Sequence, residues 1–287
     1  MLYAVTHASG QLGSTIIKLL TAKVGHGNVI GIARTPSKAA HLGVETRKGD
    51  YNSKKDFDTA LQGVDRLLIV SNSGDPEPRK QQHHNIIDAA KNAGVSKIVY
   101  VSIANNTTEG TAFSAIVASN RVTERDVQNS GLDFVIGRNG IYIEPDLEYV
   151  SEYEKRGAIW NCANDGKCGY TGRSELAEAY ANLLIHDDHN GKVLNLTGPG
   201  ITQADLVSAI NAAFGTSLVF ENMTFADYLA ERKAAIGDFM GTVIAGIYDG
   251  IAKGNFDTTS DFEAVAGRPH KSLSEMIKEF RESASNS

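Results

Sequence analysis

The chain of 287 residues lacks several features that would assign it to a specialised class. No apolar run approaches the roughly 20 residues needed to cross a bilayer, so we expect no membrane span. The first apolar run begins at Leu2 and leaves no room for a secretion signal, which favours the cytoplasm. The net charge is −6, and lysines and arginines are scattered rather than clustered, so a nucleic-acid partner is not expected. The two cysteines, Cys162 and Cys168, match neither a zinc site nor a redox pair and are predicted to be free thiols.

What the chain does have is an N-terminal stretch that is typical of a dinucleotide-binding βαβ unit. A β-prone run at 2–6 precedes a turn with Gly10 and Gly13, and apolar residues at helical spacing follow over 14–23. A second strand is predicted over 29–33. Gly10 would let backbone approach a pyrophosphate, Gly13 would let the helix pack close to the strand, and the helix N-terminus would hold the anion. The alternative is a parallel α/β domain whose first turn happens to be rich in glycine.

His7 stands where the first glycine of a three-glycine fingerprint is expected. A histidine with positive φ is uncommon, so either the turn needs no positive φ there or it stores some strain. We hypothesise that His7 narrows the turn and weakens binding of the dinucleotide. An unchanged dissociation constant for the dinucleotide in His7→Gly would contradict that hypothesis.

The residues after the second strand point to the cofactor. Arg34 ends the strand, Lys38 follows, and no Asp or Glu lies between them. An acidic residue here would accept bonds from the ribose 2′-hydroxyl of NAD, whereas arginine suits a 2′-phosphate. NADP is therefore favoured, with NADPH preferred over NADH; the alternative is that Arg34 is merely solvated.

The predicted architecture is a Rossmann-like, doubly wound parallel α/β sheet. Strands are predicted at 2–6, 29–33, 44–47, 66–70, 97–101 and 133–137. Helices are predicted between these strands at 14–23, 53–61, 79–93 and 112–129. A further helix is predicted to begin at Pro36, with Thr35 as its cap. This alternation predicts the strand order 3-2-1-4-5-6 and a ligand crevice at the carboxyl ends of strands 1 and 4.

The rest of the chain is predicted to form a smaller C-terminal α/β lobe over the crevice. We assign residues 1–139 to the NAD(P)-binding Rossmann domain and 140–287 to a lobe that does not fold independently. A helix is predicted over 144–155, turns over 157–172, and a helix and a strand within 173–197 that return to the main sheet.

With these motifs located, the chain resembles the NmrA-like branch of the atypical short-chain dehydrogenases. It is most similar to type 2 NAD(P)H:quinone oxidoreductases and triphenylmethane dye reductases. The motif Thr-Gly-Ala-Thr-Gly-Gln-Leu-Gly is matched from Thr6 to Gly13, and the Arg-Asn-Gly-x-Tyr run from Arg138 to Tyr142. Crevice position and this resemblance together predict these cofactor-binding residues: Thr6, His7, Ala8, Gly10, Gln11, Leu12, Arg34, Lys38, Asp50, Tyr51, Ser71, Asn72, Ser73, Ser102, Arg138 and Gly140.

The chain lacks the Tyr-x-x-x-Lys pair of ordinary short-chain dehydrogenases, since no tyrosine lies between Ala104 and Ile141. That pair protonates a developing alkoxide, so a carbonyl-reducing dehydrogenase is disfavoured. A quinone needs less help from an acid. Hydride addition gives it a phenolate-like anion, and the corresponding phenol has a pKa near that of tyrosine, roughly 10. We therefore predict a reductase for a small quinone-like acceptor, with Asn139 and Tyr142 as candidate catalytic residues. Tyr142 has the alternative role of supporting the lobe interface.

Two further questions remain open at this point. The chain can instead be a non-catalytic NADP(H) sensor that acts through a protein partner, because its binding residues are legible and no catalytic residue is unambiguous. It can also be a monomer or a homodimer. No metal site is expected, because His186 to His189 lacks a second ligand cluster.

Overall fold

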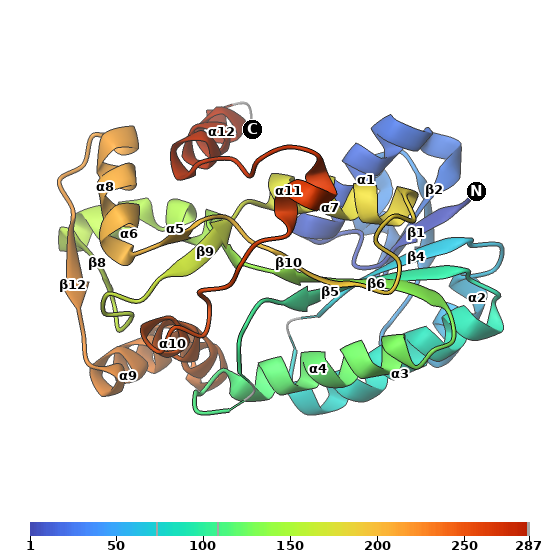
Figure 1. The fold of residues 1–287 in the computed structure, drawn as a ribbon, viewed down its shortest axis with the longest axis horizontal. Helices are drawn as coiled ribbons and strands as arrows, with labels where there is room; N and C mark the ends of the chain where they lie inside the picture. The colour runs from blue at the N-terminus through green and yellow to red at the C-terminus, as the bar shows by residue number, and fades with distance from the viewer. Residues whose placement is uncertain (73, 108, 286–287) are drawn as a thin grey trace.

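The computed structural model describes residues 1–72, 74–107 and 109–285 and is built around a seven-stranded parallel sheet (Figure 1). The sheet order is β3-β2-β1-β4-β5-β6-β10. Its strands are β1 (Tyr3–Val5), β2 (Val29–Ala33), β3 (Glu45–Lys48), β4 (Arg66–Val70), β5 (Lys97–Ile103), β6 (Asp133–Asn139) and β10 (Val193–Leu196). This confirms the predicted order 3-2-1-4-5-6, and β10 pairs with β6 as the predicted return of the chain requires.

Helices cover both faces of this sheet, because successive strand side chains point to opposite sides. Val5, Leu68 and Val99 belong to the core cluster shared with one helix layer, whereas Ala4 and Leu67 belong to the cluster on the other face. The first layer contains α1 (Gln11–Val24), α7 (Arg173–Ile185) and α11 (Phe262–Ala266). The second contains α2 (Lys54–Ala60), α3 (Pro76–Asn92) and α4 (Ser114–Gln128) (Figure 1). Short 3₁₀ helices, η1 (His26–Asn28) and η2 (Pro36–Leu42), flank β2.

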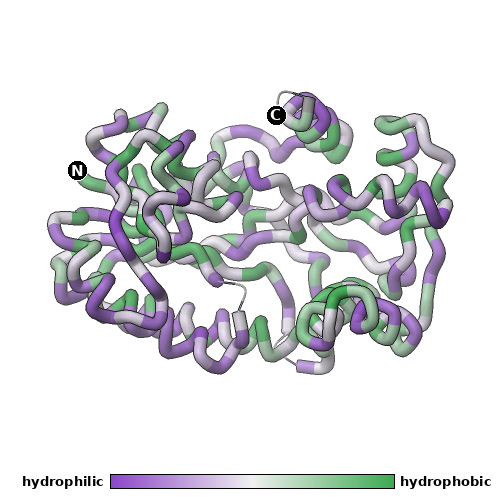
Figure 2. Tube along the Cα trace, turned by 180° about the vertical axis from the view of Figure 1, so that it is seen from behind, coloured by the Kyte–Doolittle hydropathy of each residue, from purple (hydrophilic) through white to green (hydrophobic). Residues whose placement is uncertain are grey.

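A lobe with its own apolar core lies beyond the carboxyl ends of the strands. It contains a three-stranded sheet of β7 (Ile141–Tyr142), β9 (Cys168–Thr171) and β11 (Gly200–Ile201), and a pair formed by β8 (Ala158–Asn161) and β12 (Val219–Asn222). Its helices are α5 (Glu144–Glu148), α6 (Val150–Arg156), α8 (Gln203–Phe214), α9 (Phe225–Ile236), α10 (Asp238–Ala252) and α12 (Leu273–Ser285). Among these, α10 is conspicuously hydrophobic in Figure 2. The division at residue 139 into two domains stays a prediction.

Several local predictions about the lobe were wrong. The helix predicted over 144–155 is two short helices, α5 and α6, and the stretch 157–172 predicted as turns contains β8 and β9. These strands pair with β12, β7 and β11. Most of these partners lie far along the chain, so local sequence patterns carried no signal for them.

Two predictions at prolines were also wrong. The helix expected to begin at Arg79 begins at Pro76, because proline fits the first turn of a helix, where its missing N–H costs nothing. The Asp75 side chain caps this helix by accepting a bond from the backbone N–H of Glu77. The segment from Pro36 is a 3₁₀ helix, and the Thr35 side chain does not cap it.

Both cysteines are buried free thiols, as predicted. Within the described chain, no helix is long and apolar enough to cross a membrane.

Candidate cofactor and active site

The glycine turn joins the carboxyl end of β1 to the start of α1. A Cβ atom on Gly13 would overlap the carbonyl oxygen of His7, so glycine is required for the close approach of helix and strand. No side chain in the described part of the chain caps α1, and its first turn holds no acidic residue. The N–H groups at this end therefore face outward with the positive end of the helix dipole, which suits an anion. Gln11 begins the helix, while Ala8 and Leu12 are buried beneath the turn.

His7 has a φ of 56°, in the left-handed region. Of the two possibilities left by the sequence, the structure therefore shows the strained one. Burial against the turn and the nearby charge of Arg34 both lower the pKa of His7.

A cavity of about 440 Å³ opens at the carboxyl ends of β1, β2, β3 and β4. Its size lies within the range of small-molecule sites, roughly 300–1,000 Å³. Six predicted residues line it together: His7, Arg34, Lys38, Asp50, Tyr51 and Asn72. Two further lining residues, Ser9 and Gly74, lie in the predicted glycine turn and in the predicted loop after β4, while sequence reasoning missed Ala33, Thr35, Gly49, Asn52, Asp75, Pro78 and Gln82. Most of these follow a strand within a few residues, which is the signal that would have found them.

Two of the predicted cofactor residues act on each other. The Tyr51 hydroxyl lies 2.6 Å from Thr6 Oγ1 and 2.7 Å from the Val70 carbonyl oxygen. Thr6 is fully buried and also accepts a bond from the Val70 backbone N–H. Burial raises the pKa of Tyr51, so this hydroxyl stays protonated. Thr6 therefore positions Tyr51 against the cavity wall and does not line the cavity itself.

The loop after β4 is held by a buried arginine. Arg79 donates to the Asn72 carbonyl oxygen at 2.9 Å, and the Asn72 side chain donates to Gln82 at 2.6 Å. The Ser71 hydroxyl lies 3.3 Å from Asn120 Oδ1. Ser73, predicted for the same loop, lies outside the described residues.

A buried charge cluster occupies the carboxyl ends of β5 and β6. Glu124 on α4 accepts bonds from Ser102 at 2.6 Å, from Arg121 at 2.6 Å, and from Nε and Nη2 of Arg138 at 2.9 and 2.6 Å. Burial alone would raise the pKa of Glu124, but the bond from Arg138 and the charge of Arg121 outweigh it and lower that pKa. The side chains of Ser102 and Arg138 are thus tied to Glu124, a partner that sequence reasoning missed. Their contact with the cofactor stays a prediction.

The two predicted catalytic residues are in contact. Asn139 Nδ2 donates to the Tyr142 hydroxyl at 2.9 Å, and the Tyr180 hydroxyl on α7 lies 2.5 Å from Asn139 Oδ1. Burial raises the pKa of Tyr142 to about 12. Because Asn139 supplies the bond that the Tyr142 oxygen accepts, Tyr142 keeps its own proton to donate. Gly140 has a packing role as well, since a Cβ there would overlap the Gly169 carbonyl oxygen on β9.

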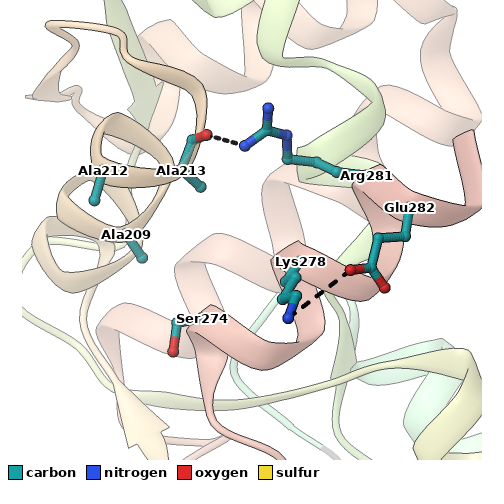
Figure 3. Close-up of a pocket in the computed structure, with 7 residues that line it drawn as sticks. All are labelled: Ala209, Ala212, Ala213, Ser274, Lys278, Arg281 and Glu282. Atoms are coloured by element: carbon teal, nitrogen blue, oxygen red, sulfur yellow. Dashed lines mark hydrogen bonds and ion pairs between the residues drawn. The ribbon is translucent and has the colours of Figure 1, made fainter. Parts of the chain in front are cut away.

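A larger groove, of about 720 Å³, lies elsewhere, between α8 and α12 (Figure 3). Three alanines line one wall, and Ser274, Lys278, Arg281 and Glu282 line the other. Arg281 donates to the Ala213 carbonyl oxygen, and Lys278 pairs with Glu282. None of the predicted site residues lines this groove, and no three His, Cys, Asp or Glu side chains converge as metal ligands within the described residues. The chemistry therefore concentrates at the strand ends.

The residues at the strand ends fit a dinucleotide: a helix N-terminus without acidic residues, a glycine turn, and a cavity with two cations beside it.

Comparison with known proteins agrees with a dinucleotide site. Residues 8–184 match the model of the NAD(P)H-binding family. The chain is 31% identical to quinone oxidoreductase 2 of Escherichia coli over 96% of both chains. It is 25% identical to the NAD(P)H azoreductase of Xenophilus azovorans, again over 96% of each.

Solved structures show the same relationship. The crystal structure of the E. coli NADPH-dependent quinone oxidoreductase complexed with NADPH has a TM-score of 0.90 at 30% identity and covers 98% of this chain and all of that one. The Citrobacter sp. triphenylmethane reductase gives the same TM-score, identity and coverage. The resemblance drawn from the sequence motifs is thereby confirmed, and the protein is an oxidoreductase that belongs to the NAD(P)H-binding family.

Proposed function

We propose that this protein transfers a hydride from NADPH directly to a quinone or a similar conjugated, electron-poor acceptor. The observation that carries the proposal is the make-up of α4, which holds neither tyrosine nor lysine and therefore no acid–base pair for an ordinary alcohol dehydrogenase. Its inward polar residues, Asn120 and Glu124, are engaged in buried hydrogen bonds. Quinone and azo reductases among the relatives support the same acceptor class.

NADPH is the proposed cofactor because Arg34 and Lys38 border the cavity at the end of β2. Both are exposed, and in the described residues no carboxylate pairs with either. Two cations without an acidic partner suit the 2′-phosphate, whereas the 2′-hydroxyl of NADH would leave them unused. When bound, NADPH supplies the hydride, and the protein supplies its position and a shielded site.

Tyr142 is proposed to hydrogen-bond the oxygen of the acceptor as charge develops on it. With a pKa of about 12, Tyr142 lies above the roughly 10 of a phenolic product, so complete proton transfer to that product is unfavourable. A hydrogen bond needs no such transfer and is worth about 0.5–1.5 kcal/mol, or roughly twofold to tenfold in rate. The product anion then takes its proton from water.

The test of Tyr142 compares two variants. We expect Tyr142→Phe to lower kcat/KM for benzoquinone by about tenfold or less, and to leave the NADPH dissociation constant unchanged, because only the hydroxyl is lost. If the Tyr142→Phe variant is fully active and the Tyr142→Ala variant is not, the Tyr142 ring supports the lobe interface and its hydroxyl has no role in the chemistry. If both variants are fully active, Tyr142 has neither role.

The function itself is tested by following the absorbance of NADPH with the purified protein, with and without benzoquinone, and with NADH in parallel. The slow reaction without enzyme must be subtracted. Acceptor-dependent turnover supports the reductase. Tight NADPH binding without turnover on several quinone, azo and dye acceptors would refute it and favour the sensor. The cytoplasmic location and the monomeric or dimeric state stay predictions.

A further inference from the structure

The backbone of His7 is unusual for the residue it carries. It is one of two non-glycine residues in the described chain with positive φ. A side chain is rarely tolerated in this conformation, because its Cβ approaches the following carbonyl oxygen. Strain of this kind persists where the surrounding structure enforces it, and it gathers at binding sites. A glycine would remove the strain, so the histidine side chain needs a reason of its own.

The imidazole ring lies beside the path expected for the cofactor. A Cβ on Gly10 would overlap the ring of His7, so the ring lies directly against the second glycine of the turn. Its centroid is 6.4 Å from that of Tyr51, edge to face. The residue is exposed overall, but the turn packs against its ring and removes part of the surrounding water, and the side chain lines the cavity shared with Arg34 and Lys38.

The charges around this ring favour an anion on one side of the cavity. Arg34 and Lys38 lie on the segment after β2, and Arg34 is close enough to lower the pKa of His7. The carboxyl groups that line the cavity, Asp50 and Asp75, follow β3 and precede α3. Neither forms an ion pair with Arg34 or Lys38 within the described residues. Among the described residues, the side of the cavity next to β2 therefore presents two cations without an ion-pair partner, beside the imidazole of His7.

We propose that the His7 imidazole is a third ligand of the 2′-phosphate of NADP(H), beside Arg34 and Lys38, so that the glycine turn itself selects NADPH over NADH. This inference rests on the proposed use of NADPH. It departs from the resembled family, in which glycine occupies this position and no side chain is available to contact the phosphate.

A proton is linked to such a contact. Without the cofactor, burial and Arg34 lower the pKa of His7, so the ring is neutral at pH 7 and above. A phosphate dianion beside the ring favours its charged form, so binding takes up a proton. NADPH affinity is then highest below the pKa that His7 has in the free protein, falls as the pH rises from that pKa to the higher pKa of the complex, and levels off above it. NADH lacks the phosphate, so its affinity does not follow this dependence.

The other charged groups that line the cavity with His7 are Arg34, Lys38, Asp50 and Asp75. Burial raises the pKa of the Tyr51 hydroxyl, so Tyr51 stays neutral between pH 7 and 9. The phosphate loses its second proton near pH 6, so measurements above pH 7 see it as a dianion throughout.

The experiment is titration calorimetry of NADPH and of NADH at pH 7, 8 and 9, each in two buffers of different ionisation enthalpy, which counts the protons taken up. His7→Asn is the main variant, because asparagine tolerates positive φ but cannot be charged. His7→Gly removes the side chain altogether. His41→Gln, an exposed histidine on η2 that does not line the cavity, is the matched control.

For the wild-type protein and His41→Gln, we expect proton uptake with NADPH alone and an NADPH dissociation constant that rises up to tenfold per pH unit. Both His7 variants should lose the proton uptake, and their preference for NADPH at pH 7 should fall about tenfold. NADPH binding by His7→Gly and His7→Asn as tight as wild type would overturn the inference. Tighter NADPH binding by His7→Gly than by the wild-type protein would also overturn it, and would support a ring that narrows the turn and weakens binding. A wild-type protein that binds NADH as tightly as NADPH would instead refute the proposed cofactor preference.

Discussion

Removal of Arg34 tests the cofactor assignment most directly. Arg34 is exposed at the end of β2 and lines the cavity, so Arg34→Ala should leave the fold unchanged. A hydrogen bond to a charged group contributes about 1.5–3 kcal/mol, and each 1.4 kcal/mol is a factor of ten in affinity. Solvent exposure places Arg34 toward the lower part of that range. We therefore expect NADPH to bind about 10- to 100-fold more weakly and NADH to be affected less than twofold.

The assay is the dissociation constant of each cofactor, measured by calorimetry or by the fluorescence of the reduced nicotinamide. Arg125→Ala is the matched control, because Arg125 is an exposed arginine on α4 and does not line the cavity. Equal weakening of NADPH and NADH would refute the reasoning, since it would mean that Arg34 contacts the shared adenosine or supports the turn. Unchanged NADPH binding would refute it as well.

Two further predictions concern the scaffold. Gly13→Ala should lower the free energy of unfolding in urea by about 1–3 kcal/mol, because the added Cβ overlaps the His7 carbonyl oxygen. Gly27→Ala is the control, since the space around Gly27 is open. Equal effects of the two substitutions would contradict the packing argument. The second concerns Glu175, which is fully buried, with its Oε1 atom 2.6 Å from Nη2 of Arg268. Burial alone would raise the pKa of Glu175, but the bonds from Arg268 and Lys271 outweigh burial and lower that pKa to about 2. Its stabilising effect is therefore complete above its unfolded pKa of about 4.3 and is lost as the pH falls toward 2. Glu175→Gln should cost about 3–5 kcal/mol at pH 7 and progressively less below pH 4 in denaturant titrations, and a cost that does not change with pH would exclude this linkage.

Features that depend on neighbours in the sequence were predictable. The strand, glycine turn and helix at the N-terminus are encoded by residues that are adjacent along the chain, and the parallel alternation allows few strand orders. Arg34 could be placed at the cavity for the same reason, since the end of a strand in this fold is a fixed location.

What only the tertiary structure decided are the partners of those residues. Glu124 lies between Arg121 and Arg138, and Tyr180 lies under Asn139, because α4 and α7 pack against β6 at one register. No local pattern encodes such a register, since it follows from how side chains on separate elements fill the same core. His7 belongs to both levels: its place in the motif could be seen in the sequence, but its positive φ and its position in the cavity wall became visible only in the structure.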